Sequence, residues 1–165
     1  MKLSLYVFVL ILVGGFQNSN ANFFAREFDK SFYYHILKSG SIKEIDDEIA
    51  QIESSSTNGK DAFVGTLLMK KADLLKVPKQ KLDAFKSGRI KFEQVYRADT
   101  SNVEYHFLRL IIQEHAPKVV KYNKDISDDA NFIKKNYKDL SPDVQKILID
   151  YSQTSKVLKP QDFQS

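Results

Sequence analysis

The 165-residue sequence contains no cysteine, which excludes disulfide bonds and a lipid anchor attached through cysteine. Stability must therefore come from hydrophobic burial alone. Histidine is also scarce, and the three residues are His35, His106 and His115. A helical metal site needs ligands three or four residues apart, whereas His106 and His115 would lie about 180° apart on a helix. No metal site is predicted.

Motifs that carry known chemistry are also missing. The sequence has no HExxH, no GxGxxG, no GxxxxGK[ST] and no GxSxG. No pattern in the sequence indicates a nucleophile with an activating base. We therefore predict no catalytic residue and no cofactor, and keep a small enzyme with an unrecognised site as an alternative.

Glycine and proline are few, at six and four residues, and long stretches without them are rich in Lys, Leu, Ile, Phe and Glu. Such stretches favour helices, and few segments alternate with the period of two that is typical of strands. We expect an all-α fold of six or seven antiparallel helices, arranged as an array of helical hairpins.

The first 21 residues have the pattern of a cleavable signal peptide. Met1 and Lys2 precede an uncharged apolar run, 3–13, and the small residues Ser19 and Ala21 stand where a signal peptidase reads. The run is shorter than the roughly 20 residues that span a bilayer. We predict a signal peptide at 1–21, a single helical domain at 22–165, and export to the periplasm or secretion. The alternatives are an uncleaved anchor or a first helix of the domain.

Apolar spacing, caps and breakers place the helices, and Ser41 with Glu44 fits a capping box at the start of the second one. Phe24, Phe28, Phe32 and Ile36 form a stripe on the first one, and Leu82 is expected to face inward on the fourth. Gly88 lies within the fourth helix and indicates a close approach of another helix backbone. The tail 159–165 is expected to be frayed. The expected helices are 24–38, 41 to the loop at 54–59, 61–76, 79–97, 103–115, 128–138 and one that starts at Ser141 and Pro142.

The segment 67–112 resembles a tetratricopeptide-type repeat. Ala72 and Leu75 match apolar positions of its first helix, and Gly88, Phe92 and Val95 match the small–aromatic–small pattern of its second. The turn at 99–102 resembles the turn between such repeats. Only one repeat can be recognised, and the turn at 76–79 is too long for the turn within such a repeat. The resemblance therefore implies a degenerate hairpin rather than a repeat array.

A second resemblance covers 107–158, with the sequences FLRLIIQEHAPKVVKYN and LSPDVQKILIDY. This run is similar to a family of uncharacterised exported helical proteins of Bacteroidetes-type bacteria. The resemblance implies export in a Gram-negative cell and carries no activity.

The expected fifth helix is apolar over more than half of its circumference, which is typical of a helix buried on most sides. Its remaining stripe is Asn102, His106, Arg109 and Gln113. If this stripe lines a groove, it offers a cation and hydrogen-bonding groups to a peptide or a carboxylate. The alternative is that Arg109 and Glu114 form intramolecular ion pairs with neighbouring helices.

Charge is uneven along the chain, although the formal net charge of +4 is mild. Residues 60–97 carry ten basic and four acidic groups, and the basic block 70–91 offers Lys70, Lys71, Lys81 and Arg89 to an anionic partner or to lipid headgroups. The alternative is that these side chains only solvate helix faces. No nucleic-acid motif is present, and membrane contact is expected to be peripheral at most.

Together these observations predict an exported, non-catalytic module that binds an unknown protein or peptide in a groove beside the fifth helix. A small enzyme and an anionic-lipid-binding protein that uses the basic block are the alternatives.

Overall fold

The computed structural model describes residues 28–164, so the predicted signal peptide lies outside the described residues. This part of the chain contains seven α-helices, three short 3-10 helices and no strand, which confirms the all-α prediction. None of the described helices is long and apolar enough to cross a bilayer. The elements are α1 Lys30–Ser39, α2 Ile42–Ser54, α3 Lys60–Leu74, α4 Pro78–Ala98, α5 Val103–His115, η1 Lys118–Val120, α6 Ile126–Asn136, η2 Tyr137–Asp139, α7 Pro142–Ser152 and η3 Pro160–Phe163.

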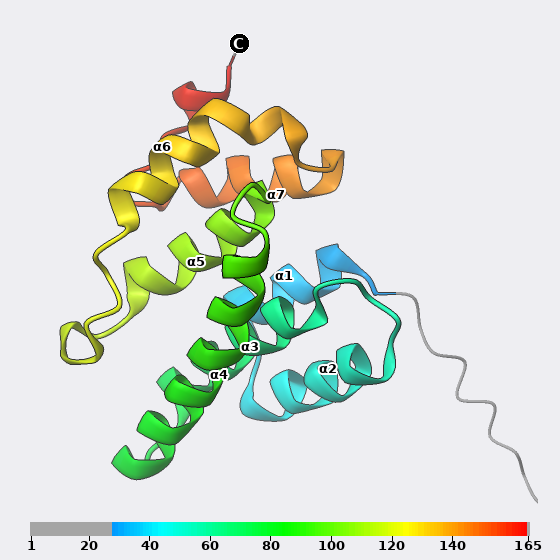
Figure 1. Ribbon diagram of the computed structural model, residues 1–165, viewed down its shortest axis with the longest axis vertical. Helices are drawn as coiled ribbons and strands as arrows, with labels where there is room; N and C mark the ends of the chain where they lie inside the picture. Colours follow the sequence, from blue (N-terminus) through cyan, green and yellow to red (C-terminus); the bar gives the residue numbers. More distant parts are fainter. Residues whose placement is uncertain (1–27, 165) are drawn as a thin grey trace, which may run out of the picture.

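Helix α3 is the centre of the arrangement, because it contacts α1, α2, α4 and α5. Its tip and the start of α4 project at one end of the molecule, and α6, α7 and the C-terminus lie at the other end (Figure 1). The loop after α5 lies on the same side as the N-terminal half of α4. This arrangement leaves α5 in the middle, with one side toward α6 and another toward the α3–α4 hairpin.

Two glycines allow α3 and α4 to cross closely. A Cβ atom on Gly65 would lie 2.6 Å from the carbonyl oxygen of Gly88 and 2.7 Å from the backbone nitrogen of Phe92. Real side chains do not tolerate such distances, so only glycine fits at this crossing. The predicted close approach at Gly88 is confirmed, while the likeness of the hairpin to a tetratricopeptide repeat stays a prediction.

The first two helices begin at clear caps. The carboxylate of Asp29 accepts a hydrogen bond of 3.0 Å from the backbone nitrogen of Phe32. Ser41 and Glu44 form the predicted capping box, with reciprocal hydrogen bonds of 3.3 and 2.8 Å. The predicted start of α1 is wrong within the described residues, because the helix begins at Lys30. Of the predicted stripe, Ile36 is buried and Phe28 packs against the core, but Phe32 is 37% exposed. The buried face is Tyr33, Tyr34, Ile36 and Leu37.

The C-terminal segment is docked, so the expectation of a frayed tail is wrong for residues 159–164. The side chain of Phe163 is buried, and its carbonyl oxygen accepts a hydrogen bond of 2.9 Å from the hydroxyl of Tyr137. Asp162 pairs with Lys134 at 3.0 Å. Short polar segments are typical of frayed ends, but here the buried Phe163 ring packs against Tyr137 of η2, and η3 also contacts α7.

Candidate functional site

The predicted stripe on α5 lies against the neighbouring elements. Asn102 is the N-cap of the helix, and its side-chain oxygen accepts a hydrogen bond of 3.0 Å from the backbone nitrogen of Glu104. His106, Arg109 and Gln113 are all buried. A side-chain cap of this kind satisfies a backbone group of the first turn and needs no external ligand.

Arg109 is bound to Asp129 on α6. Its Nε and Nη2 atoms donate hydrogen bonds of 2.8 and 2.7 Å to the two carboxylate oxygens, and its guanidinium lies 3.8 Å from the centre of the Tyr96 ring on α4. Burial acts to lower the pKa of Arg109, but the hydrogen bonds and charge of Asp129 outweigh this effect and raise it. The arginine is therefore a permanent cation whose charge is matched inside the protein.

His106 belongs to the same cluster. Its Nδ1 atom lies 2.7 Å from a carboxylate oxygen of Asp129, and its Nε2 atom lies 2.9 Å from the carbonyl oxygen of Thr100. Its ring stacks on Phe132 of α6, with centroids 4.0 Å apart. Both ring nitrogens face oxygen atoms of the protein, so neither is directed toward a ligand.

Asp129 lies in the first turn of α6, and the sequence alone did not single it out as a site residue. The period of a helix shows which residues share a face of α5, but it does not show which acid of another helix meets that face. Gln113 extends this polar cluster, with Nε2 3.5 Å from a carboxylate oxygen of Asp125, and its Oε1 atom has no hydrogen-bond partner among the described residues.

The two glutamates of α5 also find internal partners. Glu104 pairs with Lys30 at 2.5 Å. Glu114 accepts hydrogen bonds from the Tyr151 hydroxyl at 2.5 Å and from the backbone nitrogen of Lys156 at 2.6 Å. Burial and the hydrogen bond to Glu114 raise the pKa of Tyr151. These contacts tie α1, α7 and the segment after α7 to α5. Arg109 forms the intramolecular ion pair of the alternative interpretation, whereas among the described residues the Glu114 carboxylate is held by hydrogen bonds rather than by an ion pair.

The other face of α5 borders an open apolar groove of about 400 Å³. Six elements form its walls: α1, α3, α4, α5, η1 and α7. Apolar side chains make up most of the lining, among them Leu37, Met69, Phe85, Phe107, Ile112 and Ile147. Charged and polar groups also line it, and they are Lys38, Lys70, Asp73, Lys81, His115, Asp150 and Thr154. A concave apolar site with a few polar groups is the usual form of a binding site.

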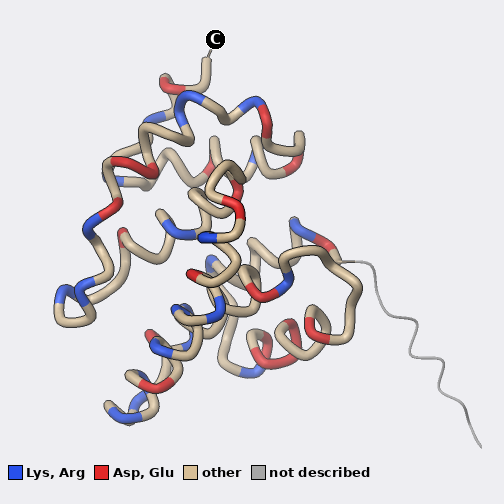
Figure 2. Tube along the Cα trace, in the orientation of Figure 1, with Lys and Arg blue, Asp and Glu red and all other residues tan. Residues whose placement is uncertain are grey.

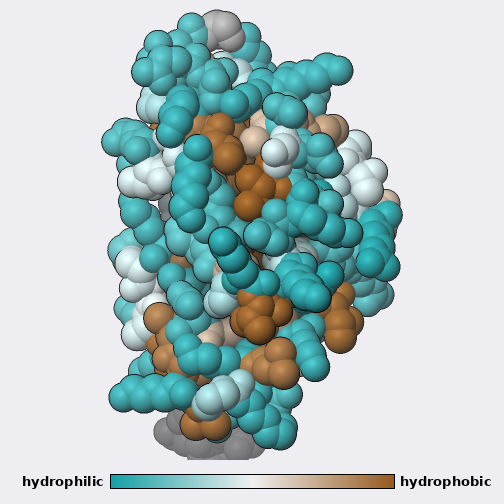
Figure 3. Space-filling model, turned by 90° about the vertical axis from the view of Figure 1, so that its left-hand side faces the viewer, coloured by the Kyte–Doolittle hydropathy of each residue, from teal (hydrophilic) through white to brown (hydrophobic). Residues whose placement is uncertain are grey.

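Apolar side chains at the groove are open to solvent. Val119 of η1 is 83% exposed and Leu82 of α4 is 44% exposed. The expectation that Leu82 faces inward is therefore wrong. Leu74 and Val77, at the tip of the α3–α4 hairpin, are 37% and 48% exposed. The side of the molecule that carries this hairpin and the loop after α5 shows groups of hydrophobic residues among hydrophilic ones (Figure 3).

The four basic candidates do not share one surface. Lys70 and Lys81 line the groove. Lys71 pairs with Asp46 of α2 at 2.5 Å, and the guanidinium of Arg89 lies 4.8 Å from the centre of the Tyr122 ring. Basic residues outnumber acidic ones along the projecting part of α4, while acidic residues gather on α2 (Figure 2). Only Lys70 and Lys81 are thus placed to meet a ligand of the groove.

Among residues 28–164, no group of three or more His, Asp or Glu side chains is arranged to hold a metal ion. Comparison of the chain with protein-family models, with curated proteins and with solved structures gives no match. The function proposed below therefore rests on the groove and its chemistry.

Proposed function

We propose that this protein is a non-catalytic interaction module that holds an apolar segment of a partner protein or peptide in the groove beside α5. The observation that carries the proposal is the open apolar groove of about 400 Å³, with Val119 and Leu82 exposed at it. Exposed apolar surface bordered by polar groups is typical of an interaction site.

The groove offers few groups for catalysis. The one imidazole among its lining residues is that of His115, whose Nδ1 atom lies 2.8 Å from the carbonyl oxygen of Ile111. The carboxylate of Asp150 pairs with Lys38 at 2.9 Å. Three residues of types that serve in acid–base sites, His106, Arg109 and Asp129, are held together in the buried cluster instead. A binding role fits these residues better than a chemical one.

Export is the second part of the proposal, and it rests on the signal-peptide pattern of residues 1–21. N-terminal sequencing of the protein purified from its native source tests it. A chain that starts at Asn22 supports export, and a chain that retains Met1 contradicts cleavage.

The binding role is tested by selecting peptides from a displayed random library on the immobilised protein. Peptides that use the groove should lose binding to Val119→Asp and to Leu82→Asp. Both changes place a carboxylate on an exposed position, so the fold should be retained. Ile90→Asp is the matched control, because Ile90 also lies on α4, is 68% exposed and does not line the groove. Selected peptides that bind all three variants equally would contradict the site.

A further inference from the structure

We propose that the partner segment is an amphipathic α-helix with acidic residues beside its apolar face. This inference rests on the proposed function of the groove and names the chemistry of its partner. Two features of the groove carry it: the helical nature of its walls and the charges among its lining residues.

The walls of the groove are helices and a 3-10 turn, whose interior backbone groups are already hydrogen-bonded within each element. An extended peptide needs hydrogen-bond partners for its own backbone, and no strand edge exists in residues 28–164 to supply them. Backbone groups buried without partners cost free energy. A helix satisfies its backbone internally and needs only an apolar face, with anchors at i, i+3 or i+4 and i+7, to fill such a groove.

The charges at the groove favour an acidic partner. Its lining includes three lysines, Lys38, Lys70 and Lys81, and two aspartates. Lys38 is matched by Asp150 at 2.9 Å, whereas the ammonium group of Lys81 donates to a backbone carbonyl oxygen, that of Asp73, at 3.1 Å. Lys70 forms no hydrogen bond or ion pair with any residue of the described part, 28–164.

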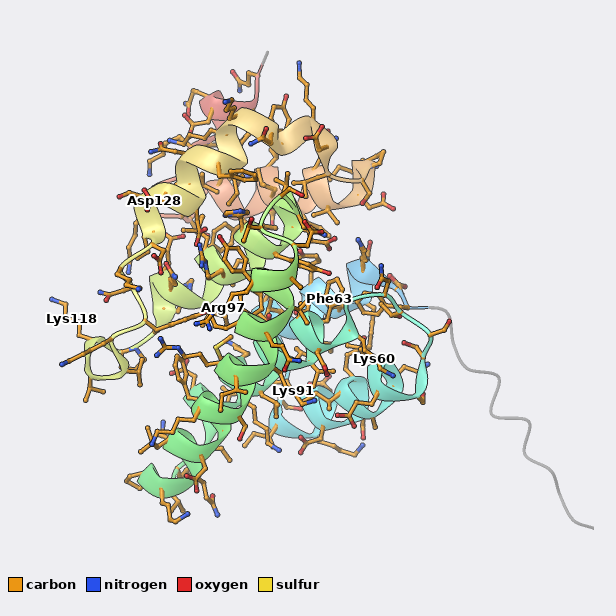
Figure 4. All side chains as sticks on the ribbon, in the orientation of Figure 1. Lys60, Phe63, Lys91, Arg97, Lys118 and Asp128 are labelled. Carbon is orange, nitrogen blue, oxygen red and sulfur yellow. The ribbon has the colours of Figure 1, made fainter. Side chains whose placement is uncertain are left out.

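The loop beside the groove adds to this positive charge. Lys118 and Lys121 flank Val119 and are exposed. Lys118 lies at the turn of the loop, on the outer side of the molecule (Figure 4). Lys118 and Lys121 do not line the groove themselves. Carboxylates on a bound helix would meet Lys70 and Lys81 in the groove, and Lys118 and Lys121 add positive charge to the loop beside it. Charges placed in this way guide the orientation and the rate of association more than they add affinity.

The same lysines and exposed apolar residues also suit an anionic membrane, but two features favour a protein helix. The groove is concave, and a flat bilayer surface does not fill it. Asp73 and Asp150 lie among the lining residues, where an anionic surface would repel them. A discrete helix fills the hollow with side chains and places its acids away from these two carboxylates.

The test measures fluorescence anisotropy of three labelled synthetic peptides of about 16 residues, long enough to form a helix on binding. One has leucines on one face and glutamates beside them, the second has lysines in place of the glutamates, and the third has serines in place of the leucines. We expect the glutamate peptide to bind about fivefold more tightly than the lysine peptide at low salt. This difference should shrink at about 0.5 M salt, where charges are screened.

Two variants assign the preference to named residues. The double variant Lys70→Glu, Lys81→Glu should favour the lysine peptide. Lys135→Glu on α6 makes a single charge reversal away from the groove and should keep the wild-type preference. Circular dichroism recognises variants that fail to fold. In that case, the salt dependence of the wild-type protein's preference for the glutamate peptide decides whether the partner is acidic.

The outcomes separate the two proposals. Equal binding of the glutamate and lysine peptides overturns the acidic partner and leaves the groove function standing. Failure of both leucine peptides, or equal binding of the serine peptide, counts against the groove function itself and overturns the inference with it. Tight binding to phosphatidylserine vesicles that the glutamate peptide does not compete with would assign the surface to a membrane instead.

Discussion

The side chain of Arg109 on α5 donates two hydrogen bonds, of 2.8 and 2.7 Å, to the carboxylate of Asp129 on α6, and the aspartate is fully buried. This pair fixes how α6 lies on α5 and occupies the polar stripe that the sequence offers as a binding surface. Helix α5 therefore has two functions on two faces: its polar stripe holds the fold together, and its apolar side borders the groove.

Arg109→Ala should lower the free energy of unfolding by about 3–5 kcal/mol, because it leaves the buried Asp129 carboxylate without its main partner. Urea denaturation followed by circular dichroism measures this change. Lys91→Ala is the matched control: Lys91 pairs with Asp61 at 2.9 Å but is 39% exposed, so about 1 kcal/mol or less should be lost. A loss at Arg109 no larger than that at Lys91 would contradict a structural role for the cluster.

Gly65→Ala should destabilise the protein by about 1–3 kcal/mol, since the added methyl group meets the backbone of α4 and forces the two helices apart. The midpoint of urea denaturation measures the loss. Ser87→Ala, at an exposed position next to Gly88, should change stability by only a few tenths of a kcal/mol. If Gly65→Ala were neutral, α3 and α4 would not cross as closely as described.

The docking of the C-terminal segment should weaken in acid. Burial acts to raise the pKa of Asp162, but the hydrogen bond from the backbone nitrogen of Lys159 and the pairing with Lys134 outweigh it and lower the pKa below its usual value. A lowered pKa contributes stability that is present above the unfolded value of about 3.9 and is lost as pH falls below it.

Asp162→Asn removes this contribution. The difference in free energy of unfolding between wild type and Asp162→Asn should therefore be present at pH 7 and disappear at about pH 2. Asp143→Asn, at an exposed acid 3.8 Å from Lys146, is the control. An Asp162 difference that is the same at both pH values would contradict the assignment.

Much of the fold follows from local patterns. The capping box at Ser41 and Glu44, the start of α7 at Pro142 and the bounds of α5 are all as predicted, because caps and breakers act within a few residues. The close approach at Gly88 is also as predicted, because a glycine inside a helix costs free energy and usually allows a contact.

Contacts between distant segments did not follow from the sequence. A helical wheel of α5 shows that Arg109 and His106 lie on one stripe. That this stripe contacts Asp129 depends on how α6 packs against α5. The groove was not located either, since residues of six elements form it and each of them reads as part of an ordinary amphipathic helix. Leu82 shows why: it has the spacing of a core residue, yet it is 44% exposed because no helix of the described residues covers it.

The most direct test of the central claim is methyl NMR of the protein, labelled at Met, Ile, Leu and Val methyl groups, during titration with the glutamate peptide. The account predicts the largest shifts at Met69, Leu82, Ile112 and Val119, which line the groove, and small ones at Ile90 and Ile133, which do not. Shifts centred on Ile133 and the α5–α6 contact, with the groove methyls unchanged, would contradict the groove as the binding site.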